Sequence, residues 1–276
     1  MTPGLSARMV NKAAAALTLG VRLAMVLPLV LGVVLAIVLN PTAWAQAPKK
    51  SGYDYMSPQL QAMQNDEANN PGMLWVRQGL SLWHNTQGVS QSCAACHGEP
   101  ATLRGVATRY PAFSEALQKP INLAQRINQC RERQGAPAFK YESQELLSLE
   151  TLVGFQSKGM PVAPPNDARL LSFSEQGRQR YFERMGQLNL SCAQCHDQRA
   201  GLRLGGNTIP TAHPTGYPIY RLEWNGVGSL QRRLRNCMNG VRAQPYPLGS
   251  LELVELELYL ARAAQGMALE TPGVRP

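Results

Sequence analysis

Cys93-Ala94-Ala95-Cys96-His97 and Cys192-Ala193-Gln194-Cys195-His196 are two copies of one pattern, C-x-x-C-H. This pattern is typical of covalent c-type haem attachment, because its two thiols can add to the two vinyl groups of one haem while the adjoining imidazole binds the iron. A zinc or redox C-x-x-C turn is the alternative, and the His that follows the second Cys in both copies favours haem instead. The sequence therefore predicts two covalently bound haem c groups, held by Cys93, Cys96, Cys192 and Cys195, with His97 and His196 as proximal iron ligands.

The chain also repeats itself over a longer distance. A shift of 107 residues places Arg126 on Arg233 and Cys130 on Cys237, and it also matches residues of segment 143–160 to residues of segment 250–267. The haem motifs are offset by 99 residues instead, so the second copy has a loop insertion of eight residues between its motif and its lone cysteine. We therefore expect two units related by internal duplication.

Each unit has the outline of a small helical domain. Segments 72–83 and 174–185 carry apolar residues at roughly helical spacing just before the haem motifs. Ser143 and Ser250 are suitable N-caps for a second helix in each unit. The predicted fold class is mainly α, with two tandem cytochrome c-like haem domains.

The domain boundaries follow from changes in composition. Residues 1–45 are predicted to be a signal peptide and residues 46–70 a polar N-terminal extension that wraps the surface or covers a partner. The three prolines of segment 158–167 are typical of a linker. This places the first haem domain at 71–160 and the second, with the candidate active-site cysteine, at 161–276.

The two cysteines outside the motifs, Cys130 and Cys237, are candidate distal ligands. In an ordinary cytochrome c the distal ligand is a Met or His well downstream of the motif, and here the equivalent position holds Cys twice. Because thiolate is an established axial ligand, we expect Cys130 to bind the first haem iron and Cys237 the second. A Cys130–Cys237 disulfide is the alternative, since cysteines of exported proteins tend to pair.

Other residues are weaker candidates for the distal position. Met160 and Met267 are equivalent in the repeat, but each lies at the end of a predicted helix, which favours packing. Met238, His84 and His213 have no counterpart in the other unit. A lone His is more often structural than a ligand, so these residues are not assigned to iron.

Positive charge is concentrated around Cys237. Neighbouring positive charges lower the pKa of a cysteine, and guanidinium groups can bind a sulfur oxyanion in bidentate fashion. A solvated basic helix face is the alternative. Cys130 also has arginines nearby, but Glu132 lies beside it and no Pro245-Tyr246-Pro247 turn follows. The second unit is therefore the better candidate for an active site. The residues concerned are Arg232, Arg233, Arg235 and Arg242 around Cys237, and Arg126, Arg131 and Arg133 around Cys130.

The N-terminal sequence indicates export. Positive residues precede the apolar run 23–39, and Ala43-Trp44-Ala45 is a small-x-small cleavage site. The run could almost span a bilayer as an uncleaved anchor, which needs about 20 apolar residues, but Pro28 and the cleavage site favour removal. Together with covalent haem attachment this predicts a periplasmic protein with no membrane span after cleavage.

The charge balance narrows the class of partner. The whole chain carries a formal charge of +9, of which the predicted signal peptide contributes three positive charges and no acids, so 9 − 3 = +6 remains. The positive residues form no run and the predicted location is outside the cytoplasm, which excludes nucleic acid. A small anion or an acidic protein is the expected partner.

Nearly all of the chain after the predicted signal resembles the SoxA family, the dihaem cytochrome c subunits of the bacterial Sox thiosulfate-oxidising system. The most specific matches are Asn70-Pro71-Gly72-Met73-Leu74-Trp75 before the first haem motif, Gly186-Gln187-Leu188-Asn189-Leu190-Ser191 before the second, and Arg235-Asn236-Cys237-Met238 followed by Arg242-Ala243 and Pro245-Tyr246. The intact first motif places the chain with the dihaem members.

The resemblance implies an L-cysteine S-thiosulfotransferase that joins thiosulfate oxidatively to a cysteine of a SoxYZ carrier protein and passes two electrons to haem. It implies that Cys237 carries a persulfide while ligating the second haem opposite His196, that Cys130 ligates the first haem opposite His97, and that Arg233 binds thiosulfate. Arg242 is added as a substrate-binding candidate from its charge and proximity. A SoxX-type monohaem cytochrome c is the implied partner. Pure electron transfer and dihaem peroxidase activity are the alternative functions.

Overall fold

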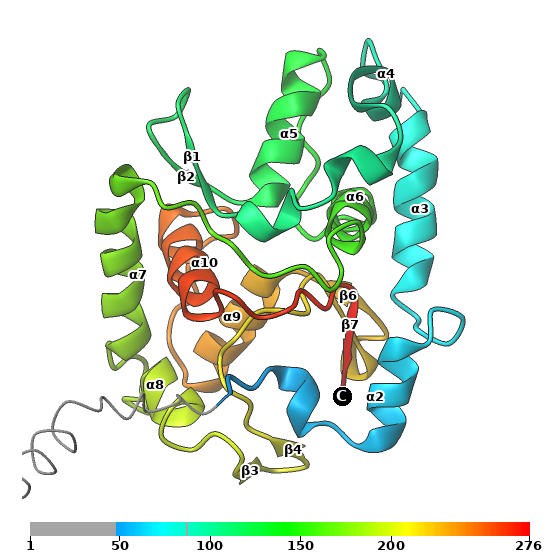
Figure 1. Cartoon of the computed structure of the whole chain (residues 1–276). Coiled ribbons are helices and arrows are strands. Elements are labelled where there is room, and N and C mark those ends of the chain that lie inside the picture. Colours follow the sequence, from blue (N-terminus) through cyan, green and yellow to red (C-terminus); the bar gives the residue numbers. More distant parts are fainter. Residues whose placement is uncertain (1–47, 87) are drawn as a thin grey trace, which may run out of the picture. The chain divides into compact units, whose positions relative to one another are not determined.

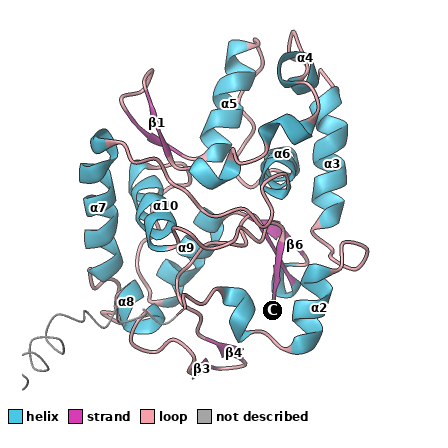
Figure 2. Cartoon of the chain, viewed as in Figure 1, coloured by secondary structure: helices cyan, strands magenta, loops and turns pink. Residues whose placement is uncertain are grey.

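Helices make up most of the regular structure (Figures 1 and 2). The computed structural model describes residues 48–86 and 88–276. Its α-helices are α2 (Pro58–Asn65), α3 (Met73–His84), α4 (Cys93–His97), α5 (Leu123–Arg133), α6 (Gln144–Phe155), α7 (Leu171–Phe182), α8 (Cys192–His196), α9 (Leu230–Gly240) and α10 (Leu251–Ala263). Its 3-10 helices are η1 (Gly52–Tyr55), η2 (Pro100–Leu103), η3 (Ala107–Arg109), η4 (Ala168–Leu170) and η5 (Leu222–Trp224).

The strands are short. They are β1 (Ala112–Ser114), β2 (Lys119–Ile121), β3 (Arg203–Leu204), β4 (Asn207–Thr208), β5 (Ile219–Arg221), β6 (Gly226–Gly228) and β7 (Gly273–Arg275). β1 and β2 form one hairpin and β3 and β4 another. The largest sheet has the order β6-β5-β7, in which β5 pairs antiparallel with β6 and parallel with β7.

The predicted signal peptide, residues 1–45, lies outside the described residues. Within the part of the chain that the structure describes, no helix is long and apolar enough to cross a membrane.

The internal duplication is evident in the order of the elements. The hairpin β1–β2 and the helices α5 and α6 recur as β5–β6, α9 and α10, and each copy begins 107 residues after its counterpart, as Ala112 and Ile219 show. The eight-residue insertion of the second copy coincides with the hairpin β3–β4, which follows α8 and has no counterpart after α4. The predicted fold class, two related and mainly helical cytochrome c-like units, is confirmed.

The N-terminal extension and the predicted linker both pack against other parts of the described chain. The N-terminal extension contains η1 and α2, and α2 packs against β7, where the Gln64 side chain accepts a hydrogen bond from the Val274 N–H at 2.9 Å. The predicted linker 158–167 packs against the protein, because Val162 is buried and its N–H donates to the Met267 carbonyl at 2.8 Å. The boundary near residue 160 stays a prediction.

A close helix crossing organises each unit. α3 packs on α6, and α7 packs on α10 (Figure 1). A Cβ at Gly79 of α3 would overlap the backbone oxygen of Ser148, and one at Gly177 of α7 would overlap that of Glu255. Both glycines therefore allow the helix backbones to approach more closely than any side chain would permit.

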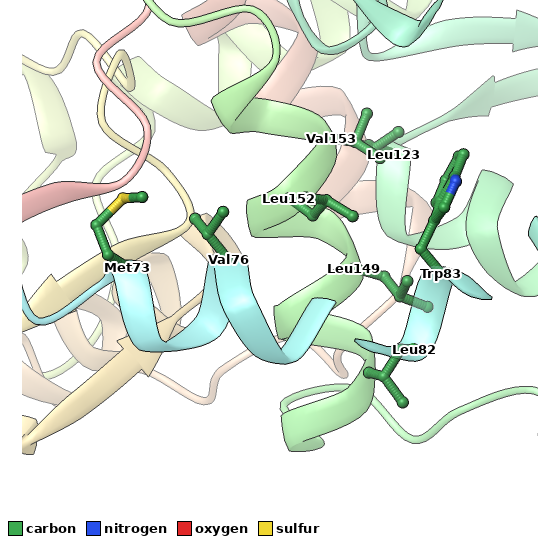
Figure 3. Close-up of a cluster of buried hydrophobic side chains, with 8 residues drawn as sticks. All are labelled: Met73, Val76, Leu82, Trp83, Leu123, Leu149, Leu152 and Val153. Carbon is green, nitrogen blue, oxygen red and sulfur yellow. The ribbon is translucent and has the colours of Figure 1, made fainter. Parts of the chain in front are cut away.

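Apolar side chains fill the space around each crossing. Figure 3 shows the first cluster, in which Trp83 of α3 lies near Leu149 of α6. The buried members of this cluster are Met73, Val76, Leu82, Trp83, Leu123, Leu149, Leu152 and Val153. Its counterpart in the second unit consists of Tyr181, Ala193, Met238, Leu253, Leu256 and Leu260. Each cluster includes a residue from the helix that carries the lone cysteine, Leu123 of α5 in the first and Met238 of α9 in the second.

Replacing Gly79 or Gly177 by Ala is expected to destabilise the protein by about 1–3 kcal/mol, because the added methyl group meets backbone that cannot rotate away. The gain in helix propensity, about 1 kcal/mol, does not offset this. Thermal unfolding followed by circular dichroism measures the effect. Gly206→Ala is the control, since a Cβ at that position has no neighbour within 4 Å. Unchanged midpoints for both helix variants would contradict the close crossings.

Two equivalent glutamates, Glu150 of α6 and Glu257 of α10, line one cavity of about 110 Å³. Burial is the main cause that raises the pKa of Glu150 to about 8, and the charges of Glu257 and Glu142 add to it. Burial likewise raises the pKa of Glu257 to about 7, although hydrogen bonds from Asn122 and Gln231 act in the opposite direction. The Asn122 amide donates to Glu257 at 2.9 Å. The duplication has thus brought two copies of one carboxyl together.

This pair is expected to make stability fall as pH rises. Above pH 4.5 the unfolded state releases protons from these glutamates, whereas the folded state still holds them. The loss of stability therefore begins near pH 4.5 and is complete above about pH 8. Glu150→Gln should therefore lose less stability than the wild type between pH 5 and pH 8.5, by on the order of 3 kcal/mol. Denaturant unfolding at the two pH values measures it. Glu132→Gln, at an exposed position, is the control, and an equal pH dependence in wild type and Glu150→Gln would refute the effect.

Candidate functional site

The first haem motif lines a cavity of about 470 Å³. Cys93, Cys96 and His97 contribute to one wall, and Cys130 of α5 also lines the cavity. This volume is within the range of protein cofactor sites, about 300–1,000 Å³. The residues fit a haem, because two thiols, an imidazole and a further thiol surround one space. The remaining walls are largely apolar, with Leu82, Trp83, Leu103, Val106, Tyr110, Leu123, Ile127, Phe139, Leu149 and Val153.

Local structure presents these groups to the cavity. α4 begins at Cys93, and the Ser92 side chain caps it by accepting from the Ala95 N–H at 3.2 Å. On α5, Arg126 and Cys130 lie four residues apart and so share one helix face. Burial raises the pKa of the Cys93 thiol and the neighbouring Cys130 adds to the increase, which shows that the two sulfurs influence each other across the cavity.

In the second unit, His196 and Cys237 line one cavity of about 170 Å³. α8 presents His196 and α9 presents Cys237, and the two side chains are close enough for each to shift the pKa of the other. The His196 Nδ1 lies 2.7 Å from the carbonyl oxygen of Pro210. A carbonyl partner holds Nδ1 in its protonated form and leaves Nε2 as the free ligand atom. This imidazole facing a thiol is the donor pair that the sequence predicts for the second haem.

The environment of Cys237 favours the thiolate. Burial raises the pKa of this thiol, but the hydrogen bond to His196 and the positive charge of Arg233 more than offset it, so the net pKa lies below the ordinary value. Burial lowers the pKa of His196, whereas its interactions with Cys237 and Pro210 raise it to a net increase. The nearby imidazole and guanidinium thus stabilise negative charge on the sulfur.

The structure brings together most of the predicted substrate site. Arg233 lines the same cavity as Cys237, one helical turn before it on α9. Arg242 does not line this cavity. It is exposed and lies in a separate recess with Glu183 and Tyr246.

Two arginines that the sequence analysis did not single out, Arg221 of β5 and Arg275 of β7, also line the Cys237 cavity. They are distant from Cys237 in sequence, so charge near the cysteine could not identify them. The 107-residue repeat offered one indication of Arg221, because it aligns this arginine with the uncharged Ser114 of the first unit. At the same cavity, Gly52, Tyr55 and Met56 come from the N-terminal extension.

Three of the alternative ligands lie elsewhere, since Met160, Met267 and His84 line neither the Cys130 cavity nor the Cys237 cavity. His213 does line the Cys237 cavity, and its Nδ1 lies 2.6 Å from the carbonyl oxygen of Lys50. All six cysteines are free thiols in the structure, and Cys130 and Cys237 line different cavities, which disfavours the disulfide between them.

Comparison with known proteins agrees with this arrangement. The family model described as SoxA/TsdA, cytochrome c domain, matches residues 78–162 and 176–269. The chain is 34% identical over 229 residues to the L-cysteine S-thiosulfotransferase subunit SoxA of Pseudaminobacter salicylatoxidans, with 82% of this chain and 80% of that protein covered. It is 31% identical over 227 residues to the subunit of the same name from Paracoccus pantotrophus, with 82% and 78% covered.

A solved structure shows the same fold. The crystal structure of SoxXA from P. pantotrophus superposes with a TM-score of 0.80 at 31% sequence identity, covering 83% of this chain and 87% of that chain. The residues matched by the family model include both C-x-x-C-H motifs and both lone cysteines. On these grounds the chain belongs to the SoxA family of c-type cytochromes.

Proposed function

We propose that this chain is the SoxA subunit of a periplasmic L-cysteine S-thiosulfotransferase. Its relatives carry that activity in their names. The proposed substrates are thiosulfate and a cysteine near the C terminus of a SoxYZ-type carrier protein, and the proposed partner is a SoxX-type monohaem cytochrome c. A SoxX-containing complex with the same fold supports that partner.

We further propose two haem c groups, one in each unit. Cys93 and Cys96 would hold the first, with His97 and Cys130 as axial ligands. Cys192 and Cys195 would hold the second, with His196 and Cys237 as axial ligands. The placement of Cys130 in the first motif's cavity and of Cys237 against His196 supports these assignments.

The proposed reaction joins two sulfur nucleophiles. A carrier thiol and thiosulfate form one S–S bond, giving a cysteine S-thiosulfonate, and release one proton and two electrons. Haem c, when bound, supplies the electron acceptor. No bond of thiosulfate breaks, and the carrier thiol loses its proton. Because both reactants are sulfur nucleophiles, the protein must bring two anionic sulfurs together and remove two electrons from them.

The chain's own residues suit this task. Cys237, with its lowered pKa, is the proposed catalytic residue and carries a persulfide, which can exchange by attack at sulfur. Arg233 would hold the sulfonate end of thiosulfate in bidentate fashion. The single observation that carries the proposal is the meeting of Cys237, His196 and Arg233 in one cavity. An electron carrier needs no such cationic recess.

Cys237→Ala is expected to reduce thiosulfate-dependent conjugation to the carrier by about 10³-fold or more, because the sulfur nucleophile is lost. Mass spectrometry of the carrier, with cytochrome reduction measured in parallel, records the product. Cys130→Ala is the matched control, since it removes the equivalent thiol of the first unit and should retain activity within about tenfold. Full conjugation by Cys237→Ala would exclude the proposed role.

The haem assignment makes a separate prediction. Intact protein should carry two covalent haems, and replacing Cys93 and Cys96 by Ala should leave one. Electron paramagnetic resonance should show two thiolate-ligated low-spin centres, one of which disappears in Cys130→Ala and the other in Cys237→Ala. An extra sulfur atom on the Cys237 peptide would support the persulfide. Loss of the same signal in both variants would contradict one cysteine ligand per haem.

A further inference from the structure

The arrangement of an arginine and a thiol at the Cys237 site is also present in the first unit, for which no substrate is proposed. Arg126 precedes Cys130 by four residues on α5, just as Arg233 precedes Cys237 on α9, and each pair lines its own cavity. A thiol with an arginine one helical turn before it is therefore present in both units. That pair alone does not explain why only one unit would bind substrate.

At the position of Arg221, the second unit has a positive charge that the first unit lacks. Arg221 is the last residue of β5, and its counterpart at the end of β1 is Ser114. Ser114 is 2% exposed and does not line the first haem cavity, whereas Arg221 is 7% exposed and lines the Cys237 cavity. The duplicated hairpin therefore places a guanidinium at the second cavity only, whereas the arginines of the first cavity, Arg126, Arg131 and Arg133, all come from α5.

The fold holds Arg221 in place from several sides. Its Nε donates to the backbone oxygen of Pro276 at 3.0 Å, and its Nη2 donates to Glu223 at 2.8 Å. Its guanidinium lies 5.1 Å from the centre of the Trp224 ring. Within the described residues, Nη1 has no hydrogen-bond partner. One edge of the guanidinium is thus anchored, and one donor nitrogen remains for a ligand.

No Asp or Glu side chain among the described residues lines the cavity, although Pro276, whose oxygen accepts from Arg221, does. The Glu223 side chain that pairs with Arg221 is 60% exposed, so solvent weakens that pair. Arg275, in contrast, pairs with Glu270 at 2.7 Å, and both side chains of that pair are less than one-fifth exposed. Arg233 forms no ion pair with any described residue.

Arg221 and Arg233 also act on each other. Burial lowers the pKa of Arg221, and the charge of Arg233 lowers it further. Both guanidiniums line the same cavity as the Cys237 sulfur. Two like charges held beside one recess repel each other, and an anion bound between them relieves that repulsion.

We propose that Arg221 is a second substrate-binding residue, which together with Arg233 holds the sulfonate group of a sulfur oxyanion dianion beside Cys237. The inference rests on the proposed function and deepens it by assigning a second cationic group to the substrate site, at a position that is Ser114 in the duplicated counterpart. Two guanidiniums match the two negative charges and the several oxygens of such an anion.

The test compares the haem-loaded wild-type protein with Arg221→Ser, which installs the residue of the first unit. The KM for thiosulfate should rise about tenfold or more, because a hydrogen bond to a charged group is lost, while kcat changes less. A second readout needs no turnover. After reduction, the alkylation rates of Cys237 by anionic iodoacetate and neutral iodoacetamide are compared by mass spectrometry of its peptide, and the iodoacetate preference should fall about threefold or more in the variant.

Matched variants make the outcome specific. Arg232→Ser is the control, because Arg232 also stacks on Trp224, at 4.2 Å, but does not line the cavity. It should leave both readouts unchanged. Arg221→Gln keeps an amide donor for the Pro276 oxygen and serves if the Ser variant does not fold or load haem. Haem absorbance and thermal unfolding report on folding in every variant.

Two results would overturn the inference. One is a wild-type protein that shows no iodoacetate preference at Cys237 over a free cysteine peptide. The other is a folded Arg221→Ser or Arg221→Gln variant with unchanged KM and unchanged preference. Failure of the proposed function is a different result, namely conjugation that persists in Cys237→Ala, and the alkylation preference can be measured regardless of it.

Discussion

The close contact of two helix backbones at one glycine is the constraint on which each unit depends. Gly79 lets α3 meet the backbone of α6, and Gly177 lets α7 meet that of α10. The haem motif follows the first helix of each pair after a short segment. The crossing therefore fixes where each motif enters its cavity, and the apolar clusters around the crossing hold that position.

On this shared frame the two sites have diverged. Both units retain an imidazole from the motif, a thiol from the following helix and an arginine one turn earlier. The second unit adds the hairpin β3–β4, residues Asn207 and Thr208 of which reach its cavity, and places Arg221 at the end of β5. In the proposed assignment, the same set of groups would bind iron alone in one unit and iron together with an anionic substrate in the other.

Segments from the two ends of the described chain complete the second site. β7 pairs with β5 and brings Arg275 to the cavity, and η1 contributes Gly52 and Tyr55. Contacts such as that of Thr211 with the Lys50 carbonyl, at 2.5 Å, hold the N-terminal segment against the second unit. The first unit has no equivalent strand in its hairpin sheet. The substrate chemistry proposed for Cys237 would therefore involve residues that the duplicated unit does not itself contain.

The haem motifs, the duplication and the presence of one lone cysteine after each motif could be predicted from the amino-acid sequence, because these are local patterns repeated at fixed spacing. Arg233 was also indicated, since it lies one turn from Cys237. Packing was needed to find that Arg221 and Arg275 line the Cys237 cavity and that Arg242 lies outside it. Neighbours on a helix follow from spacing, whereas charges from separate strands meet only through sheet pairing and packing.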